Sequence, residues 1–76
     1  MIDLLKHIIK QLVDDPEKVE IVEKKENGVD VYYITVSTED RGRIIGRDGR
    51  TINSLRALIN AASAKAGSKA VVKILD

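Results

Sequence analysis

The chain has 76 residues, no Cys, Phe or Trp, and a formal net charge of +1. A chain this short buries only about 60% of its unfolded surface, so we expect a single domain over residues 1–76. Hydrophobic residues make up 43% and charged residues 33% of the sequence, which is typical of a compact soluble domain and excludes a disordered chain. The absence of Cys excludes disulfides and fits a cytoplasmic location. No apolar run approaches the ~20 residues that span a bilayer.

The positive charge is concentrated in one segment. Between residues 41 and 56 lie all five arginines and one acidic residue, a net charge of +4: Arg41, Arg43, Arg47, Arg50 and Arg56. The rest of the chain has eight Lys against eleven Asp and Glu, a net charge of −3. Arginine offers a planar fork that matches phosphate, whereas lysine is a hydrated point charge. The segment is therefore either an anion-binding surface or a solvated helix face.

The first half of the chain predicts a helix and a hairpin. Apolar residues at helical spacing predict an amphipathic helix over residues 2–14, which Pro16 stops. Residues 17–25 alternate as in a strand, and residues 29–37 are rich in β-branched and aromatic types. Between them, Asn27-Gly28 predicts a type I′ turn. Tyr32 and Tyr33 point to opposite faces of the second strand, one packed under a helix and the other free to line a groove or stack on a base.

The second half predicts two helices and a last strand. A short helix is expected through residues 41–45, capped by Ser37 or Thr38, and Ser37 and Asp40 have the spacing of a capping box. A long helix follows over residues 50–66 and ends at Gly67; its apolar stripe is Ile52, Leu55, Ile59 and Ala62. Residues 69–75 form the last strand. This order, α-β-β-α-α-β, predicts an α+β fold in which three helices cover one face of a three-stranded sheet.

The loop between these two helices, residues 46–49, reads Gly-Arg-Asp-Gly. Glycine at both ends permits positive φ and close approach of a ligand to the backbone. The long helix begins directly after the loop, so its unpaired N–H groups and the positive end of its dipole favour an anion such as a phosphate. Arg47 lies at the tip, flanked by Arg43 and Arg50. The glycine spacing excludes a P-loop and a Rossmann fingerprint.

The run Ile44-Ile45-Gly46-Arg47-Asp48-Gly49-Arg50-Thr51-Ile52 resembles the signature of the KH domain, (I/V)-I-G-x-x-G-x-x-I. Over its whole length the chain is similar to type II KH domains, with a mixed sheet, and to the small stand-alone bacterial KH proteins of the KhpA type. The resemblance implies that the loop clamps about four nucleotides of single-stranded RNA. The RNA-binding residues predicted in this way are Arg43, Ile44, Ile45, Gly46, Arg47, Asp48, Gly49 and Arg50. One of Ile44 and Ile45 would support the groove floor, while Ile52 anchors the long helix in the core.

The resemblance also implies an RNA chaperone or post-transcriptional regulator. Such proteins form a homodimer, or a heterodimer with a larger KH-domain protein linked to cell elongation and division. The alternative function is a dimerisation subunit with vestigial RNA binding, using the small-sided face of Ala57, Ala61, Ala62, Ala64 and Ala66.

Two features qualify this interpretation. Asp48 is an acid inside the clamp; it repels phosphate if it points inward, or else it points outward and either caps the following helix or complements its dipole. His7 is the only histidine and cannot hold a metal by itself. No catalytic arrangement is recognisable, so we expect no enzymatic activity, no cofactor and no metal.

Overall fold

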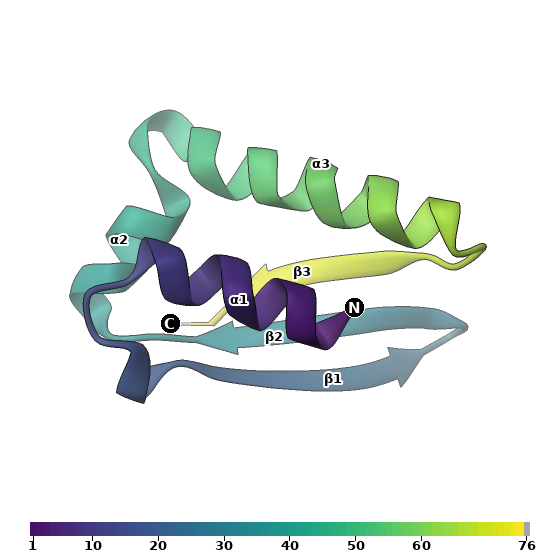
Figure 1. The fold of residues 1–76 in the computed structure, drawn as a ribbon, viewed down its shortest axis with the longest axis horizontal. Helices are drawn as coiled ribbons and strands as arrows, with labels where there is room; N and C mark the ends of the chain where they lie inside the picture. Colours follow the sequence, from purple (N-terminus) through teal and green to yellow (C-terminus); the bar gives the residue numbers. More distant parts are fainter. Residues whose placement is uncertain (76) are drawn as a thin grey trace.

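The computed structural model describes residues 1–75, in which helices lie over one face of a three-stranded sheet (Figure 1). The elements follow in the order α1 (Ile2–Leu12), β1 (Glu20–Glu26), β2 (Val29–Thr35), α2 (Thr38–Ile45), α3 (Arg50–Lys65) and β3 (Ala70–Ile74). Short 3₁₀ turns lie at Pro16–Lys18 and Arg47–Gly49. The predicted α-β-β-α-α-β order and α+β class are confirmed.

The sheet is mixed, with β2 in the centre. β1 pairs with β2 in the antiparallel sense, through a turn in which Asn27 and Gly28 have φ of 52° and 79°. The predicted type I′ turn needs positive φ at both positions, and this requirement is met. β3 runs parallel to β2, with Val72 opposite Tyr32. Both β2 and β3 therefore point toward the end of the sheet where α2 lies (Figure 1).

The core between the helices and the sheet is almost entirely aliphatic, as a chain without Phe or Trp requires. Its fully or nearly fully buried members include Leu5, Ile9, Tyr32, Ile34, Ile44, Ile52, Leu55, Ile59 and Val72. Tyr32 is thus the tyrosine that packs under the helices. Tyr33 lies on the face that the helices leave open, where its hydroxyl donates a hydrogen bond of 2.6 Å to Glu26 and Lys24 and Lys73 approach its ring.

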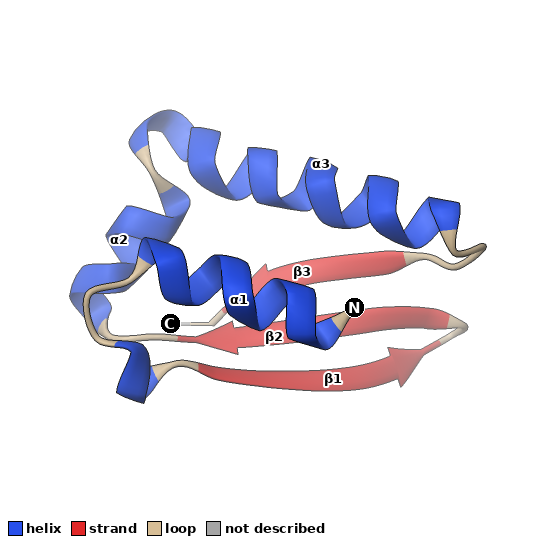
Figure 2. Cartoon of the chain, viewed as in Figure 1, coloured by secondary structure: helices blue, strands red, loops and turns tan. Residues whose placement is uncertain are grey.

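Two predicted boundaries near the start of the chain are wrong. The first helix ends at Leu12 instead of residue 14, because Val13 is extended and the next two N–H groups bind a carboxylate on α2. Residues 16–18 form a 3₁₀ turn (Figure 2), so the first strand begins at Glu20 and not at residue 17.

The second helix also begins earlier than predicted. Ser37 accepts a 3.2 Å hydrogen bond from the N–H of Asp40, which starts α2 at Thr38 and ends β2 at Thr35. Only half of the predicted capping box forms, because the Asp40 side chain turns away to another partner. On α3, Ser63 is buried where Ala62 was expected, and the Ser63 hydroxyl is satisfied by the Asn60 carbonyl at 3.1 Å.

Candidate functional site

The glycine loop, residues 46–49, connects α2 to α3 beyond the end of the sheet, at the upper left of Figure 1. Gly46 has φ 74° and ψ 179°, a conformation essentially restricted to glycine. Gly49 has φ 74° and ψ 13°, in the left-handed region. The N–H of Gly49 donates to the carbonyl of Gly46 at 3.3 Å. Both glycines are therefore required by the backbone path of the loop.

Gly46 is also required by space. A Cβ at this position would lie 2.3 Å from Thr51 Oγ1 and 2.8 Å from Thr51 Cβ. The loop backbone thus rests directly on the first turn of α3, whose N-cap, Gly49, supplies no side-chain hydrogen bond. Because the first N–H groups of a helix have no partner within it, this end of α3 can receive an anion.

Asp48 is exposed and has φ 56° and ψ 27°. Aspartate and asparagine tolerate this left-handed conformation better than most other residues, which accounts for an acid at this place. The prediction that Asp48 caps α3 is wrong, since no side chain caps that helix.

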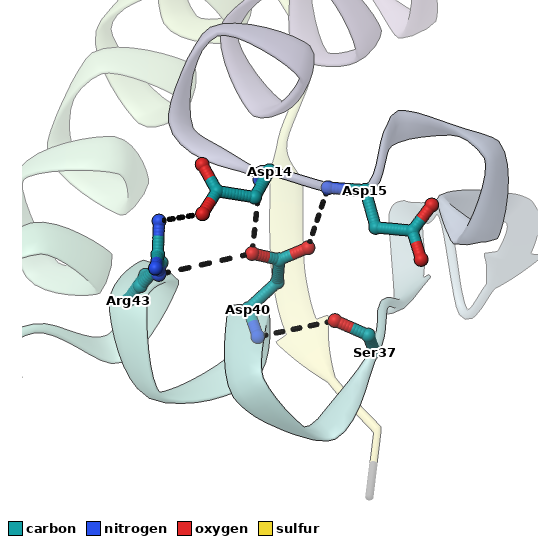
Figure 3. Close-up of polar contacts among 5 residues, drawn as sticks. All are labelled: Asp14, Asp15, Ser37, Asp40 and Arg43. Carbon is teal, nitrogen blue, oxygen red and sulfur yellow. Dashed lines mark hydrogen bonds and ion pairs between the residues drawn. The ribbon is translucent and has the colours of Figure 1, made fainter.

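The three predicted arginines have different surroundings. Arg43 pairs with Asp14, and its Nε lies 3.9 Å from Asp40 Oδ1 (Figure 3). Arg47 and Arg50 are exposed, and neither has a carboxylate within ion-pair distance among residues 1–75. Two cations, on the loop and directly after it, are therefore available to a ligand, whereas Arg43 is committed to the contact between α1 and α2.

The predicted isoleucines also differ in how deeply they are buried. Ile44 is fully buried in the core, and Ile52 is 5% exposed, so Ile52 anchors α3 as predicted. Ile45, the last residue of α2, is only partly buried. Of the two apolar residues before the loop, Ile45 is the one that presents surface beside it.

A buried carboxylate fixes the position of α2. Asp40 is 1% exposed, and its two oxygens accept hydrogen bonds of 3.0 Å from the N–H groups of Asp14 and Asp15 (Figure 3). The bond from Asp14 does most to lower the pKa of the Asp40 carboxyl, against burial, which raises it; Asp15, Ser37 and Arg43 lower it further. Asp40 therefore ties the end of α1 to the helix that leads into the loop.

Three residues near the loop escaped the sequence-based prediction. The Thr51 side chain lies against Gly46, where it would clash with a Cβ. The Asn53 amide would lie 3.6 Å from a Cβ on Gly49. Arg56 Nε donates a hydrogen bond of 3.2 Å to the Val72 carbonyl. For Asn53 and Arg56 the signal was their spacing from Gly49, since positions 49, 53 and 56 share one face of a helix. The same face continues to Asn60, which borders a hollow of about 340 Å³ beside β3.

Two general features limit the kinds of site in this region. Within residues 1–75, no group of three or more acidic or histidine side chains could hold a metal ion. No helix in the described part of the chain is both long and apolar enough to cross a bilayer.

Comparison with known proteins shows the family of this chain. The family model described as "KhpA/KhpB, KH domain" matches residues 2–74. This chain belongs to the KhpA/KhpB KH-domain family. The α-β-β-α-α-β order with a mixed sheet is the type II arrangement of the KH fold.

Individual relatives span most or all of the chain. The RNA-binding protein KhpA of Thermotoga maritima is 48% identical over 61 residues, 80% of this chain and 81% of its own. That of Chlamydia caviae is 40% identical over 76 residues, covering 100% of this chain and 97% of its own. That of Listeria monocytogenes is 37% identical over the full length of both chains.

Proposed function

We propose that this chain binds single-stranded RNA, with the glycine loop clamping the backbone of about four nucleotides. The observation that carries the proposal is the loop itself: two glycines in positive-φ conformations enclose Arg47 and Asp48 at the uncapped start of α3. Arg47 and Arg50 supply positive charge without an acidic partner among residues 1–75. Support also comes from the relatives, which are named as RNA-binding proteins.

The roles of the predicted site residues follow from their positions. Arg47 and Arg50 would neutralise phosphates, and Gly46 and Gly49 would let the nucleic-acid backbone approach the loop. Ile45 would form the apolar floor next to it. Ile44 and Arg43 act indirectly in this proposal, through the core and through the contact with α1. The cellular role that we propose is that of a cytoplasmic RNA chaperone or post-transcriptional regulator without enzymatic activity.

The proposal is tested by fluorescence anisotropy with a labelled, mixed-sequence single-stranded RNA. The logarithm of the affinity for a single strand falls linearly with the logarithm of the salt concentration, with a slope of ~0.7 per neutralised phosphate. If the protein neutralises about three phosphates, wild-type affinity should fall about 20-fold over a fourfold rise in salt. Arg47→Asp should lower the affinity at least tenfold and reduce the slope. Asp48→Asn suits the same backbone conformation and removes one negative charge, so it should raise the affinity about two- to fivefold.

Lys6→Asp is the matched control, because it makes the same charge reversal at an exposed position on α1. It should bind within about twofold of the wild type, and circular dichroism should show that all variants fold. Wild-type protein that does not bind RNA, or Arg47→Asp no weaker than Lys6→Asp, would contradict the clamp.

A second candidate function, association with another KH chain, is favoured by the exposed side of α3. Between Arg56 and Lys65 the exposed residues carry no charge: Ala57, Leu58, Asn60, Ala61 and Ala64. A surface helix normally has charged residues on its solvent side. Leu58 is 49% exposed, beside a hollow that Ile8, Leu12 and Thr51 help to line. We infer that this face pairs two copies of the chain, or this chain with a larger KH-domain protein.

Sedimentation velocity tests the pairing at micromolar concentration. We expect wild-type protein to sediment as a dimer and Leu58→Lys as a monomer, because a charge at the centre of an apolar contact is left unpaired. Val22→Lys is the control: Val22 is 48% exposed, almost as much as Leu58, but lies on β1. A monomeric wild type, or monomers produced by Val22→Lys alone, would argue against the α3 face.

A further inference from the structure

The face of the sheet opposite the helices, which we call the open face, has an apolar centre. Val31 and Tyr33 lie on it, because they alternate along β2 with the core residues Tyr32 and Ile34. Val31 is nearly fully buried, although the helices cover only the other side of the sheet (Figure 1). Residues directly opposite each other in a sheet share a face, so the partners of Val31 and Tyr33 on the outer strands complete the centre of the open face: Val22, Lys24, Val71 and Lys73.

Two lysines approach the Tyr33 ring from opposite strands. The distance from the ring centroid to Nζ is 5.6 Å for Lys24, on β1, and 5.8 Å for Lys73, on β3. Neither ammonium group has a carboxylate within ion-pair distance among residues 1–75. The contact of an exposed cation with an aromatic ring is weak. Both charges are therefore available to an anionic partner on the open face.

The open face offers apolar surface between these two charges. Val22, Lys24, Tyr33 and Leu75 line a hollow of about 350 Å³, and the side chains of Val22, Val71 and Leu75 are exposed. The residues of β2 that point to this side carry no charge: Val29, Val31, Tyr33 and Thr35. An uncharged row with a cation on each flank complements a segment that has an apolar stripe with carboxylates on both sides of it.

The distribution of charge favours a protein over a nucleic acid as that segment. Glu20 and Glu26 lie on the open face at the two ends of β1, with Lys24 between them. A polynucleotide carries a negative charge at every nucleotide and would bring phosphates close to these carboxylates. An amphipathic helix can place carboxylates beside the lysines alone. Its aliphatic side chains also match Val22 and Leu75, which cannot hydrogen-bond to a base.

We propose that the open face binds an acidic amphipathic helix of a partner protein, with the apolar stripe of the helix along β2 and its carboxylates beside Lys24 and Lys73. A helix is an element that commonly covers the apolar face of a sheet. The helices of this chain do not fit, because α1 contains one acidic residue and α3 none, and the Asp40 carboxylate of α2 is buried.

This inference goes beyond RNA binding and does not depend on it. The open face and the glycine loop lie on different parts of the molecule, the loop being beyond the end of the sheet between α2 and α3 (Figure 1). RNA at the loop and an acidic helix at the open face are therefore expected to bind together, each with the affinity that it has alone.

The test titrates ¹⁵N-labelled protein with a synthetic amphipathic helix of about 18 residues, which has leucines along one stripe and glutamates on both sides of it. A matched peptide has lysine in place of every glutamate. We expect the acidic peptide to shift the amides of residues 22–24, 31–33 and 71–73 and to leave residues 46–51 unmoved. The basic peptide should bind at least tenfold more weakly, because it places like charges beside Lys24 and Lys73.

Reversal of both charges should exchange the two peptides. The double variant Lys24→Glu, Lys73→Glu should bind the acidic peptide at least tenfold more weakly than the wild type and should now prefer the basic peptide. Binding of the basic peptide also shows that this variant is folded. The matched control is the double variant Lys6→Glu, Lys10→Glu, with the same change of charge at exposed positions on α1, and it should bind both peptides within about twofold of the wild type.

The proposal is overturned if the acidic peptide does not bind, if both peptides bind alike, or if the shifts fall on α3 instead of the open face. A single-stranded RNA that shifts the amides of residues 22–24 and displaces the acidic peptide would also overturn it, and would assign the open face to nucleic acid. RNA binding at the loop is measured separately, with RNA alone, and would stand or fall independently of these outcomes.

Discussion

Gly46→Ala is expected to have the largest effect on the site. The new Cβ would meet Thr51 at 2.3 Å, and the backbone, at φ 74° and ψ 179°, is in a region that costs a residue other than glycine about 1–3 kcal/mol. We expect the free energy of unfolding to fall by about 3 kcal/mol and the affinity for RNA to fall at least tenfold. Urea unfolding measures the first change, and anisotropy at low temperature, where the variant remains folded, measures the second.

Two neighbouring glycines provide matched controls. A Cβ on Gly42, inside α2, would meet nothing within 4 Å, so Gly42→Ala should stabilise the fold by about 0.5–1 kcal/mol. A Cβ on Gly49 would lie no closer than 3.6 Å to any atom. Gly49→Ala would still force alanine into a positive φ, which should lower the free energy of unfolding by about 1 kcal/mol. The expected order of stability is Gly42→Ala, wild type, Gly49→Ala, Gly46→Ala. If Gly46→Ala behaved like Gly42→Ala, the backbone account of the loop would be wrong.

Asp40→Asn is expected to have the largest effect on stability away from the loop. The carboxylate accepts two backbone hydrogen bonds from the end of α1, and an amide would present an N–H group to one of these donors. Leaving a buried N–H without its acceptor is costly, and we expect the melting temperature to fall by about 10 °C at pH 7. Asp15→Asn is the control, because Asp15 bonds to Asp40 only through its backbone; its melting temperature should change by no more than about 2 °C.

The effect of Asp40 should depend on pH. Its pKa is lowered in the folded protein, so its contribution to stability is complete above the unfolded pKa of about 4 and is lost as pH falls through the folded value. The melting temperatures of wild type and Asp40→Asn should therefore differ by a constant amount between pH 7 and pH 5 and converge below about pH 4. A difference that persisted undiminished at the lowest accessible pH would show that the carboxylate charge is not the cause.

Much of the fold was predictable because its signals are local. Asn27-Gly28 specified the hairpin turn, and the spacing of Ile52, Leu55 and Ile59 specified the buried side of α3. The errors lie where a distant group decides the outcome. Asp40 ends α1 from 25 and 26 residues away, and no pattern within the first helix contains that information.

The candidate site was predictable as a segment and less so as a set of side chains. Gly46 and Gly49 follow from the backbone that such a loop requires. Arg43 and Arg47 are chemically identical in the sequence, and only the packing of α1 against α2 shows that Arg43 is paired with Asp14. Arg56 belonged to the same arginine cluster, but its position depends on the edge of β3, a strand that follows 14 residues later in the chain.

The measurement that tests the central claim most directly is a ¹⁵N–¹H correlation spectrum of wild-type protein titrated with a short single-stranded RNA. We predict the largest shift changes at the amides of residues 46–51, smaller changes at 70–74 on the edge of β3, and none at 20–26 on β1. Shift changes confined to β1 or α1, with the loop amides unmoved, would contradict the account.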